Sequence, residues 1–543
     1  MPELETGRKL HWGGLVLALL VFAIGVWHSQ FLIDDAFISF RYAKNWAGGH
    51  GLVYNIGNPQ PVEGYSNFAW VALLAAGHRI GLPLEGLSQV LGWLSGAMTL
   101  ILTEQVLRCR LGLDKLRTGI VLIALAALPV FHVWCSGGLE TAFFGLLMLA
   151  TWIRLTSPKD SMGHDIVTGA FGGVLLLTRP EGVVWVLGLL LAAWIGQGKL
   201  APRRWVPYLA VALAIGFLQL LWRHSFYGSW LPNTVHAKSS LSGSSVQRGA
   251  RTLATWGLLF LWPLLALGAP LATRATKPRR LALSACVVLL GGLAYNLLVG
   301  GDWMPFFRFM APLSAFFAIA LGVLLTKLGS KSLLVCSALG ILIAGLPVVD
   351  VMLIPQGLRE TLYFRQFRIG YQTEWARLQT GRRNTLMYSA LGRALDQAMQ
   401  PTDSWTGGAI GAVGYYSGIQ ILGRNGLVNR EVAKRQVNPG EGTAGHEKRV
   451  PRIWFRDQAP TFYDCMLHPK RIRPSGPAFD KAVGELFKGF VADPHEEGLR
   501  NSCYVEARPV KDVPGLPAAS TLMLLMHTDD PAKADAFWSR YGV

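Results

Sequence analysis

Long apolar runs recur along this chain and constrain its fold more than any other feature. About 20 consecutive, mostly apolar residues are needed for a helix to cross a bilayer. Only 15% of the residues are charged, against about 25% in soluble domains, so much of the surface is expected to face lipid. We therefore predict a polytopic α-helical membrane protein with eleven spans. They are residues 13–32, 88–107, 118–135, 139–156, 166–178, 182–198, 205–222, 252–271, 281–299, 307–326 and 332–353.

The apolar segment 66–82 is short for a span and contains His78 and Arg79 near its end. Lys and Arg gather in the cytoplasmic loops of membrane proteins, and this rule indicates how the segment lies. If it rests flat on the outer surface as an amphipathic helix, the inner loops hold 16 basic residues. If it spans, most of that charge moves outside, so we predict the flat helix. The 16 residues are Arg8, Lys9, Arg108, Arg110, Lys115, Arg117, Lys159, Lys199, Arg203, Arg204, Arg274, Lys277, Arg279, Arg280, Lys327 and Lys331.

The same arrangement defines the outer side of the membrane. It places there the mixed-charge, Gly- and Pro-rich loops, which are predicted to carry the reactive residues. The net charge of +18 is scattered over short loops, a pattern that argues against a nucleic-acid-binding stripe. The expected location is a bacterial inner membrane, with the reactive loops facing the periplasm. These loops are residues 33–87, 136–138, 179–181, 223–251 and 300–306, with everything after residue 354.

The chain is predicted to divide into two domains. Residues 1–354 form the transmembrane catalytic module, and residues 33–87 are its first outer loop with two juxtamembrane helices. Residues 355–543 contain no further run long enough to span and are predicted to form an extracytoplasmic α/β domain that begins helically. Within it, Ala409–Val413 and Thr521–Met526 are predicted strands.

The six cysteines show no CxxC or Cys/His spacing typical of a metal site. Cys465 and Cys503 fall in the outer domain, where an oxidising compartment would permit a disulfide between them. The predicted chemistry requires no metal or other cofactor, although acidic outer loops could hold a divalent cation. The N-terminal apolar run has no small-residue cleavage site after it, so it is predicted to remain as the first span and not to act as a signal peptide.

Asp34 and Asp35 stand where the first span meets water, at the start of a helix predicted to end at Gly48. On that helix Asp34 shares a face with Arg41, and Asp35 shares the next face with Ser39. An Asp at a helix start can simply cap it. Two adjacent carboxylates exceed that need, because like charges at low dielectric repel and raise one pKa. Such a group can act as a general base toward a hydroxyl.

Further candidate residues lie in the outer loops and in the tail. Each has a structural alternative, such as a surface carboxylate, an Arg–Glu tie, an interfacial snorkelling cation or a member of the aromatic belt. Ionisable residues at membrane depth are nevertheless functional by default. Arg and Lys suit a phosphate, and carboxylates beside an aromatic face suit a sugar. The cations are Arg179, His236, Lys238 and Arg308, and the others are Glu63, Tyr65, Asn67, Glu140, Glu181, Asp302, Trp303 and His446.

Six motifs follow one another along the chain: DDAFISFRYAKNWAGGHGLVYN with VEGYSNFAW, then SGGLET, TRPEG, YGSWLPNTVHAK, GGDWMPFFRF and GYYSGIQILGRNGLVN. In this order they resemble the arabinofuranosyltransferase family of the GT-C superfamily, over about the whole chain. The resemblance implies a multi-span GT-C core, an outer active site and a polyprenyl-phosphate-linked donor whose expected sugar is arabinofuranose. It places the first-loop catalytic acid at Asp34 or Asp35.

The resulting expectation is an integral-membrane glycosyltransferase of cell-wall biogenesis that uses a hydroxyl of a cell-surface glycan or protein as acceptor. Inversion and retention of the anomeric centre both fit, the latter with a carboxylate nucleophile. One alternative is a lipid-linked sugar flippase or transporter, which predicts mid-span charges and inverted repeats. Another is a surface-polysaccharide ligase or polymerase. The expected partners are the donor lipid, the glycan or glycoprotein acceptor and the bilayer, with no nucleic acid.

Overall fold

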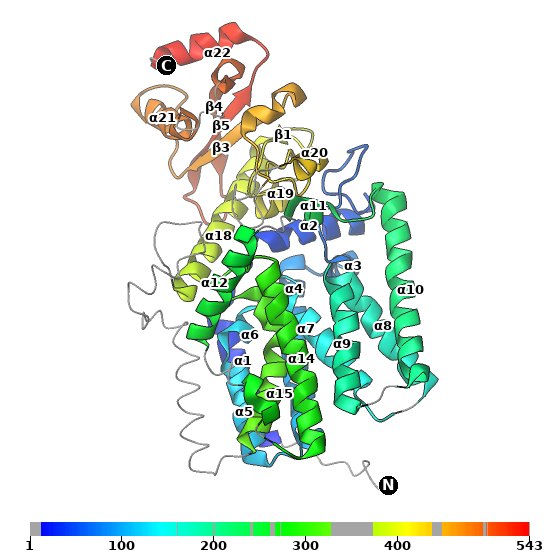
Figure 1. Ribbon diagram of the computed structural model, residues 1–543. Coiled ribbons are helices and arrows are strands. Elements are labelled where there is room, and N and C mark those ends of the chain that lie inside the picture. Colours follow the sequence, from blue (N-terminus) through cyan, green and yellow to red (C-terminus); the bar gives the residue numbers. More distant parts are fainter. Residues whose placement is uncertain are drawn as a thin grey trace.

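A computed structural model describes residues 12–159, 161–198, 201–238, 243–260, 266–271, 273–326, 373–436, 448–491, 496 and 498–541. Its long helices stand side by side in a tall layer, and a unit built around a β-sheet rests on one end of that layer (Figure 1). The two ends of the helical layer therefore have different surroundings.

The described helices confirm a polytopic helical membrane protein. By length and composition, four of them could cross a membrane, namely Leu84–Arg110, Pro202–Tyr227, Thr276–Leu298 and Arg308–Leu325. Four shorter apolar helices, Gly13–His28, Thr141–Leu155, Met162–Thr178 and Gly182–Gln197, coincide with further predicted spans. The layer consists of α1 (Trp12–His28), α4 (Leu84–Gln105), α5 (Lys115–Ala127), α7 (Thr141–Leu155), α8 (Met162–Thr178), α9 (Gly182–Gln197), α10 (Pro202–Tyr227), α12 (Gly243–Leu259), α14 (Thr276–Leu298) and α15 (Ser314–Leu325).

Two predicted spans are not continuous helices over the described residues, and the predicted number of eleven spans stays a prediction. The segment 118–135 breaks after α5, because Pro129 starts the separate five-residue helix α6 (Pro129–Val133) and proline cannot continue a helix through its missing N–H. In the segment 252–271, the described residues form the end of α12 and a short 3₁₀ turn, η2 (Ala266–Leu271), that contains Pro270; residues 261–265 lie outside the described part. The predicted span 332–353 lies outside the described residues.

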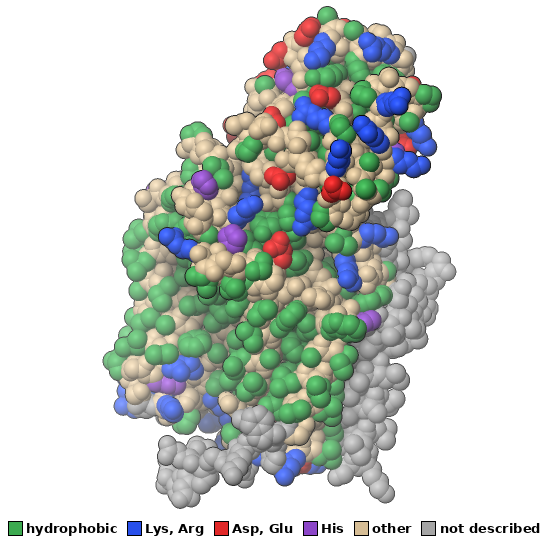
Figure 2. Space-filling view, turned by 180° about the vertical axis from the view of Figure 1, so that it is seen from behind, with side chains coloured by type: hydrophobic (Ala, Val, Ile, Leu, Met, Phe, Trp, Pro, Cys, Tyr) green, Lys and Arg blue, Asp and Glu red, His purple; other side chains and the backbone are tan. Residues whose placement is uncertain are grey.

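Exposed apolar side chains form a belt across the described helical layer. Helix α10 packs mainly against α8 and leaves large side chains such as Phe217 and Leu218 exposed, at 58% and 65%. Figure 2 shows apolar side chains covering the middle of the layer, whereas charged side chains gather at its lower end and over the sheet unit. Such a belt is stable only against lipid, since exposed apolar patches of this size are costly in water.

Two short helices lie at the end of the layer beneath the sheet unit. Helix α2 (Asp34–Ala47) ends at Gly48, as predicted. Helix α3 (Phe68–Arg79) has 12 residues and is therefore about 18 Å long, too short for a hydrocarbon core of about 30 Å. Its inner face buries Trp70, Val71 and Leu74 against its neighbours. The prediction that segment 66–82 does not span is therefore confirmed.

The loops predicted to share a side of the membrane lie together. At the end away from the sheet, Arg110 donates to the Ile153 carbonyl at 2.7 Å, and Arg204 donates to the Ser157 carbonyl at 2.8 Å. At the other end, the Ile33 amide donates to the Gly137 carbonyl at 3.2 Å. Basic loops thus occupy one end and the motif-bearing loops the other.

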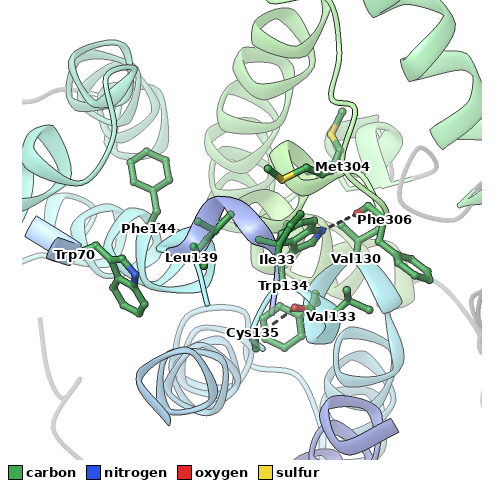
Figure 3. Packing of buried hydrophobic residues seen from close by; sticks show 14 of the residues in the cluster. Ile33, Trp70, Val130, Val133, Trp134, Cys135, Leu139, Phe144, Met304 and Phe306 are labelled. Carbon is green, nitrogen blue, oxygen red and sulfur yellow. Dashed lines mark hydrogen bonds between the residues drawn. The ribbon is translucent and has the colours of Figure 1, made fainter. Parts of the chain in front are cut away.

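Buried aromatic packing fixes the loops at the motif-bearing end (Figure 3). The indole N–H of Trp134 donates to the carbonyl oxygens of Pro305 and Phe306 at 3.1 and 3.3 Å. Gly138 has a φ of +81°, and a Cβ there would lie 2.9 Å from the Cβ of Ala36. The loop 136–138 can therefore press directly against the first turn of α2 only because it has glycine at that point.

The sheet unit contains a five-stranded sheet in the order β2-β1-β3-β5-β4. The pairs of β1 are parallel, whereas β5 runs antiparallel to both of its neighbours. Helices α21 (Pro477–Val491) and α22 (Pro531–Trp538) accompany it, and α18 (Glu374–Ala398) connects it to the layer (Figure 1). The predicted domain boundary at residue 354 lies outside the described residues. The strands are β1 (Ser404–Trp405), β2 (Gln420–Ile421), β3 (Phe462–His468), β4 (Cys503–Lys511) and β5 (Ala519–His527).

One prediction for the tail is confirmed, one is wrong, and the disulfide that the sequence left open is absent from the structure. Thr521–Met526 lies in β5 as predicted, but 409–413 leads into the helix α19 (Gly411–Ser417), which ends at Gly418 in the left-handed conformation. Cys465 and Cys503 are free thiols. They lie on β3 and β4, which flank β5 on opposite sides, so their Cα atoms are about two strand spacings apart, beyond the reach of a disulfide.

Candidate active site

The first turn of α2 presents Asp34 and Asp35 in different directions. The N-cap position of α2 is Ile33, and no side chain caps the helix. Capping of its own helix is therefore not the role of Asp34. Instead, Asp34 Oδ1 accepts from the Ala412 amide at 2.7 Å and Oδ2 from the Gly411 amide at 3.2 Å. Its carboxylate caps a different helix, α19 of the sheet unit.

The environment of Asp34 shifts its proton affinity. Burial raises the pKa of Asp34 to about 6, and the neighbouring charge of Asp35 raises it further, whereas the backbone hydrogen bonds from Ala412 and Gly411 lower it. Desolvation of the carboxylate is thus the larger effect. Asp34 and Asp35 are both partly exposed, but within the described residues Asp35 makes no hydrogen bond or ion pair. Of the two aspartates, Asp35 is therefore the one whose carboxylate oxygens are both available to accept a hydrogen bond or a proton.

The face of α2 that bears Asp35 leads into a chain of buried polar groups. One turn beyond Asp35, Ser39 Oγ and the Asn67 side chain exchange hydrogen bonds of 3.1 and 3.2 Å. Asn67 Nδ2 then donates to Glu140 Oε2 at 2.8 Å. Asn67 and Glu140 were both predicted from sequence, and the structure brings them together.

Arg179 continues this chain. Its Nη1 lies 3.6 Å from Glu140 Oε1, and its Nε lies 2.6 Å from Glu181 Oε1. Burial alone would lower the pKa of Arg179, but the carboxylates of Glu181 and Glu140 raise it above its usual value. Tyr295, at the end of α14, also hydrogen-bonds Glu181. The ion pair between Arg179 and Glu181 that the sequence suggested is therefore present, and Glu140 is a second carboxylate partner of Arg179.

The loop 300–308 adds a second ion pair, between Asp302 and Arg308. Arg308 Nε lies 3.6 Å from Asp302 Oδ2, and both atoms are buried without a hydrogen bond. The guanidinium groups of Arg308 and Arg179 both lie over the Phe309 ring, at 4.8 and 5.1 Å from its centre. The shared ring places the two arginines in one site, which we call the rim cluster. Its members are Asn67, Glu140, Arg179, Glu181, Tyr295, Asp302 and Arg308.

Strained backbone aims Arg308 at the rim cluster. Phe306 and Phe307 both have positive φ values, 50° and 49°, a conformation that costs on the order of 1 kcal/mol or more for each non-glycine residue. Burial of both rings, the Trp134 hydrogen bonds, and a 2.6 Å bond from the Phe306 amide to Glu374 hold it. Such outliers concentrate at functional sites.

Glu63 and Tyr65 form a separate cluster near the end of α10. Glu63 Oε2 lies 2.6 Å from Arg223 Nε, whereas Oε1 is buried without a partner. Burial raises the pKa of Glu63 to about 7, although Arg223 lowers it. Tyr65 is buried, with its ring 4.7 Å from that of Tyr42 and its hydroxyl 3.4 Å from that of Tyr227. Tyr65 is thus a core residue here.

Of the remaining predicted residues, His236 and Trp303 are described and make other contacts. His236, on α11 (Asn233–Lys238), lies near Lys434 and Lys448, and burial followed by these two charges lowers its pKa. Grouping His236 with Arg179 and Arg308 is therefore not supported. The Trp303 carbonyl accepts a hydrogen bond from Arg377. The Lys238 side chain and His446 lie outside the described part of the structure.

Sequence reasoning missed Tyr295, Arg223 and Glu374. Tyr295 and Arg223 stand near the outer ends of predicted spans, where a single polar residue resembles an ordinary interfacial anchor. Glu374 is separated in sequence from its partner Phe306 by 68 residues. Among the described residues, no group of three His, Cys, Asp or Glu side chains could hold a metal ion. That the chemistry requires no metal stays a prediction.

The fold and the site together define a polytopic helical membrane protein, with a carboxylate- and arginine-lined site at one rim beneath a mixed α/β unit. ArnT from Cupriavidus metallidurans has this fold, with 14% identity, a TM-score of 0.57, and coverage of 94% of this chain and 97% of that chain, in a structure bound to undecaprenyl phosphate. Its apo structure gives a TM-score of 0.55 at 15% identity. At this identity the likeness shows the fold.

The sequence is similar to the terminal β-(1→2)-arabinofuranosyltransferase of Mycobacterium tuberculosis, with 30% identity over 291 residues. The match covers 50% of this chain and 44% of that enzyme, so the chain spans less than half the length of this relative. The resemblance inferred from the six motifs over about the whole chain is therefore confirmed for half of the chain. Residues 370–495 also match a family described only as a domain of unknown function, DUF8728.

Proposed function

We propose that this chain is a membrane glycosyltransferase that transfers a sugar from a polyprenyl-phosphate donor to a hydroxyl acceptor at the outer rim of the helical layer. The observation that carries the proposal is the rim cluster, in which Arg308 and Asp302 keep unpaired buried atoms toward one another. Its position on an ArnT-like fold supports a lipid-phosphate donor. The similarity to the mycobacterial enzyme favours arabinofuranose as the sugar.

Asp35 is the general base in this proposal. Both oxygens of Asp34 accept backbone N–H groups of α19, so taking a proton there would disrupt a structural contact. Asp35 is partly exposed and lies one helical turn from Ser39, which contacts Asn67 of the rim cluster. A general base must reach the acceptor hydroxyl, and of the two carboxylates Asp35 has this freedom.

Arg308 is the better phosphate ligand of the two clustered arginines. Arg179 is already engaged by Glu181 at 2.6 Å and by Glu140. Among the described residues, Arg308 is held by a 3.6 Å approach to Asp302 and by the face of Phe309. A phosphate can replace this loose contact with a bidentate hydrogen-bonded pair. Asp302 is then released to accept a sugar hydroxyl.

In the proposed transfer, one bond of the anomeric carbon breaks and another forms. The bond between the anomeric carbon and the phosphate oxygen breaks, and its electron pair stays on the polyprenyl phosphate, whose growing negative charge Arg308 stabilises. The acceptor oxygen bonds to the anomeric carbon, and its proton passes to Asp35. Glu140 and Asp302 bind sugar hydroxyls. No cofactor is part of this scheme, and the acceptor is a cell-surface glycan or protein on the periplasmic side of a bacterial inner membrane.

The test is an assay of the purified chain with a panel of polyprenyl-phosphate sugars, measuring released polyprenyl phosphate. We expect release with the arabinofuranose donor and a fall of at least about 100-fold in kcat for Asp35→Asn, the scale on which general-base catalysis contributes. Gln60→Asn, at an exposed loop position, is the matched control. Absence of release with every donor would refute the function, and full turnover by Asp35→Asn would refute the base assignment.

A further inference from the structure

The short helix α19 lies along α2 and contacts it at both ends. Near the start of α19, the Gly411 and Ala412 amides donate to Asp34. Near its end, Arg41 Nη1 donates to the Gly414 carbonyl at 2.8 Å, and Nη2 donates to the Ile419 carbonyl at 2.7 Å. An acidic side chain thus meets the positive end of the α19 dipole, and a basic side chain meets its negative end.

The spacing of these contacts matches the two helices to each other. Asp34 and Arg41 are seven residues apart on α2, and α19 itself has seven residues. The separation of Asp34 and Arg41 along α2 and the length of α19 are therefore both about 10 Å. Arg41 is almost fully buried and also donates to the Tyr54 carbonyl at 2.7 Å. A mutual fit with both ends bound leaves α2 little freedom to slide or rotate.

Glycines allow the two backbones to meet. A Cβ at Gly411 would lie 1.9 Å from the main-chain oxygen of Asp34, and a Cβ at Gly414 would lie 2.1 Å from the Tyr54 hydroxyl oxygen. On the other side of α19, a Cβ at Gly392 of α18 would lie 2.9 Å from the Val413 carbonyl oxygen. The stack of α18, α19 and α2 therefore has no room for displacement at these points.

We propose that α19 positions the catalytic base: by holding Asp34 and Arg41, it fixes the direction in which Asp35 projects into the rim cluster. This inference rests on the proposed function. Asp34 and Arg41 are positioning residues, because they act through the backbone of α2. The first turn of α2 lacks a side-chain cap of its own, so its order depends on contacts with other segments, among them α19 and the loop 136–138. The inference gives a role to part of residues 370–495, the region that matches a family of unknown function.

The decisive variant is Gly411→Ala, and its matched control is Gly408→Ala. At Gly408 a Cβ would meet no atom within 4 Å, so the same chemical change three residues earlier is harmless. Two quantities are measured in the full chain, the transfer kinetics and the amide hydrogen exchange of peptides covering residues 31–40. We expect Gly411→Ala to lower kcat about tenfold or more, to leave the donor KM within about threefold of the wild type, and to speed exchange in the first turn of α2.

Hydrogen exchange separates failure of this inference from failure of the proposed function. If the wild type transfers no sugar, the function is refuted, and exchange in α2 still tests the contact with α19. If Gly411→Ala matches Gly408→Ala in both exchange and kcat, positioning by α19 is refuted. Should Gly411→Ala fail to fold, Asp34→Asn gives the same reading, because an amide of equal size can accept only through one oxygen. Full kcat and wild-type exchange in Asp34→Asn would then overturn the inference.

Discussion

At the scale of single residues, the two arginines of the rim cluster differ in how much of their binding capacity is already used. Arg179 bridges two carboxylates, Glu181 and Glu140, whereas Arg308 has one loosely held partner. A substitution that keeps the charge but removes the fork should therefore have different effects at the two positions. We expect Arg308→Lys to weaken binding of undecaprenyl phosphate about tenfold or more, since hydrogen bonds to charged groups contribute about 1.5–3 kcal/mol.

The same change at Arg179 should act on stability. The compact ammonium of lysine cannot contact two separated carboxylates at once. A buried carboxylate that loses its partner lowers the stability of the folded protein by up to about 5 kcal/mol. Arg179→Lys should therefore lower the thermal midpoint more than it lowers lipid binding, and each variant serves as the other's control. Binding assays and melting curves measured on both proteins check this. Equal loss of lipid affinity in the two variants would contradict the assignment of the phosphate to Arg308.

Glu63 should make the stability of the protein depend on pH. Burial raises its pKa to about 7 from an ordinary value of 4.5, so between these values the folded state holds more protons than the unfolded state. The favourable contribution is complete below about pH 4.5 and is lost as the pH rises through about 7. The shift corresponds to about 3 kcal/mol. Melting from pH 5 to 8 should show the wild type losing stability relative to Glu63→Gln, and parallel curves would contradict the assignment.

Sequence reasoning located the candidate residues but could not pair them. Asp34 and Asp35 stand out because two carboxylates follow an apolar run. Single ionisable residues next to apolar runs stand out in the later loops, namely Glu140, Arg179, Asp302 and Arg308. Which aspartate is engaged depends on a contact with Gly411, 377 residues away in sequence. Contacts of this separation are set by tertiary packing, which local pattern does not encode.

At the scale of elements, the helices were predictable and the exceptions have local causes. The length and apolarity of a span are properties of a single segment, so α4, α10 and α14 follow directly from the sequence. The helix α19 was predicted as a strand because Ala409–Val413 is short and apolar. Its helical form depends on the carboxylate of Asp34 at its start and on Arg41 at its end. An element stabilised by another element cannot be read from its own residues.

The loop 300–308 shows the same dependence in its backbone. Gly300 and Gly301 have positive φ values, which glycine adopts freely, but the strain at Phe306 and Phe307 is maintained by Trp134 and Glu374 from other parts of the chain. The motif GGDWMPFFR indicated a reactive loop, but not the conformation that directs Arg308. The function of the loop therefore depends on packing around it as well as on its own sequence.

At the scale of the whole molecule, the proposed mechanism requires the two ends of the helical layer to face opposite sides of a membrane. Cys109 is a native exposed thiol beside the basic loop at one end, and Ser475 is exposed on the sheet unit at the other. Positive-inside placement puts Cys109 in the cytoplasm and Ser475 in the periplasm, together with the rim cluster. Each position can therefore report the orientation of one end.

We expect a membrane-impermeant maleimide added to intact cells to label Ser475→Cys in a Cys109→Ser background and to leave Cys109 of the wild type unlabelled. Permeabilised cells should show labelling at both positions, which controls for thiol reactivity. The reverse pattern would place Asp35 and Arg308 in the cytoplasm, where an acceptor on the outer surface could not reach them. Orientation thus decides whether the base and the phosphate ligand can act on the acceptor at all.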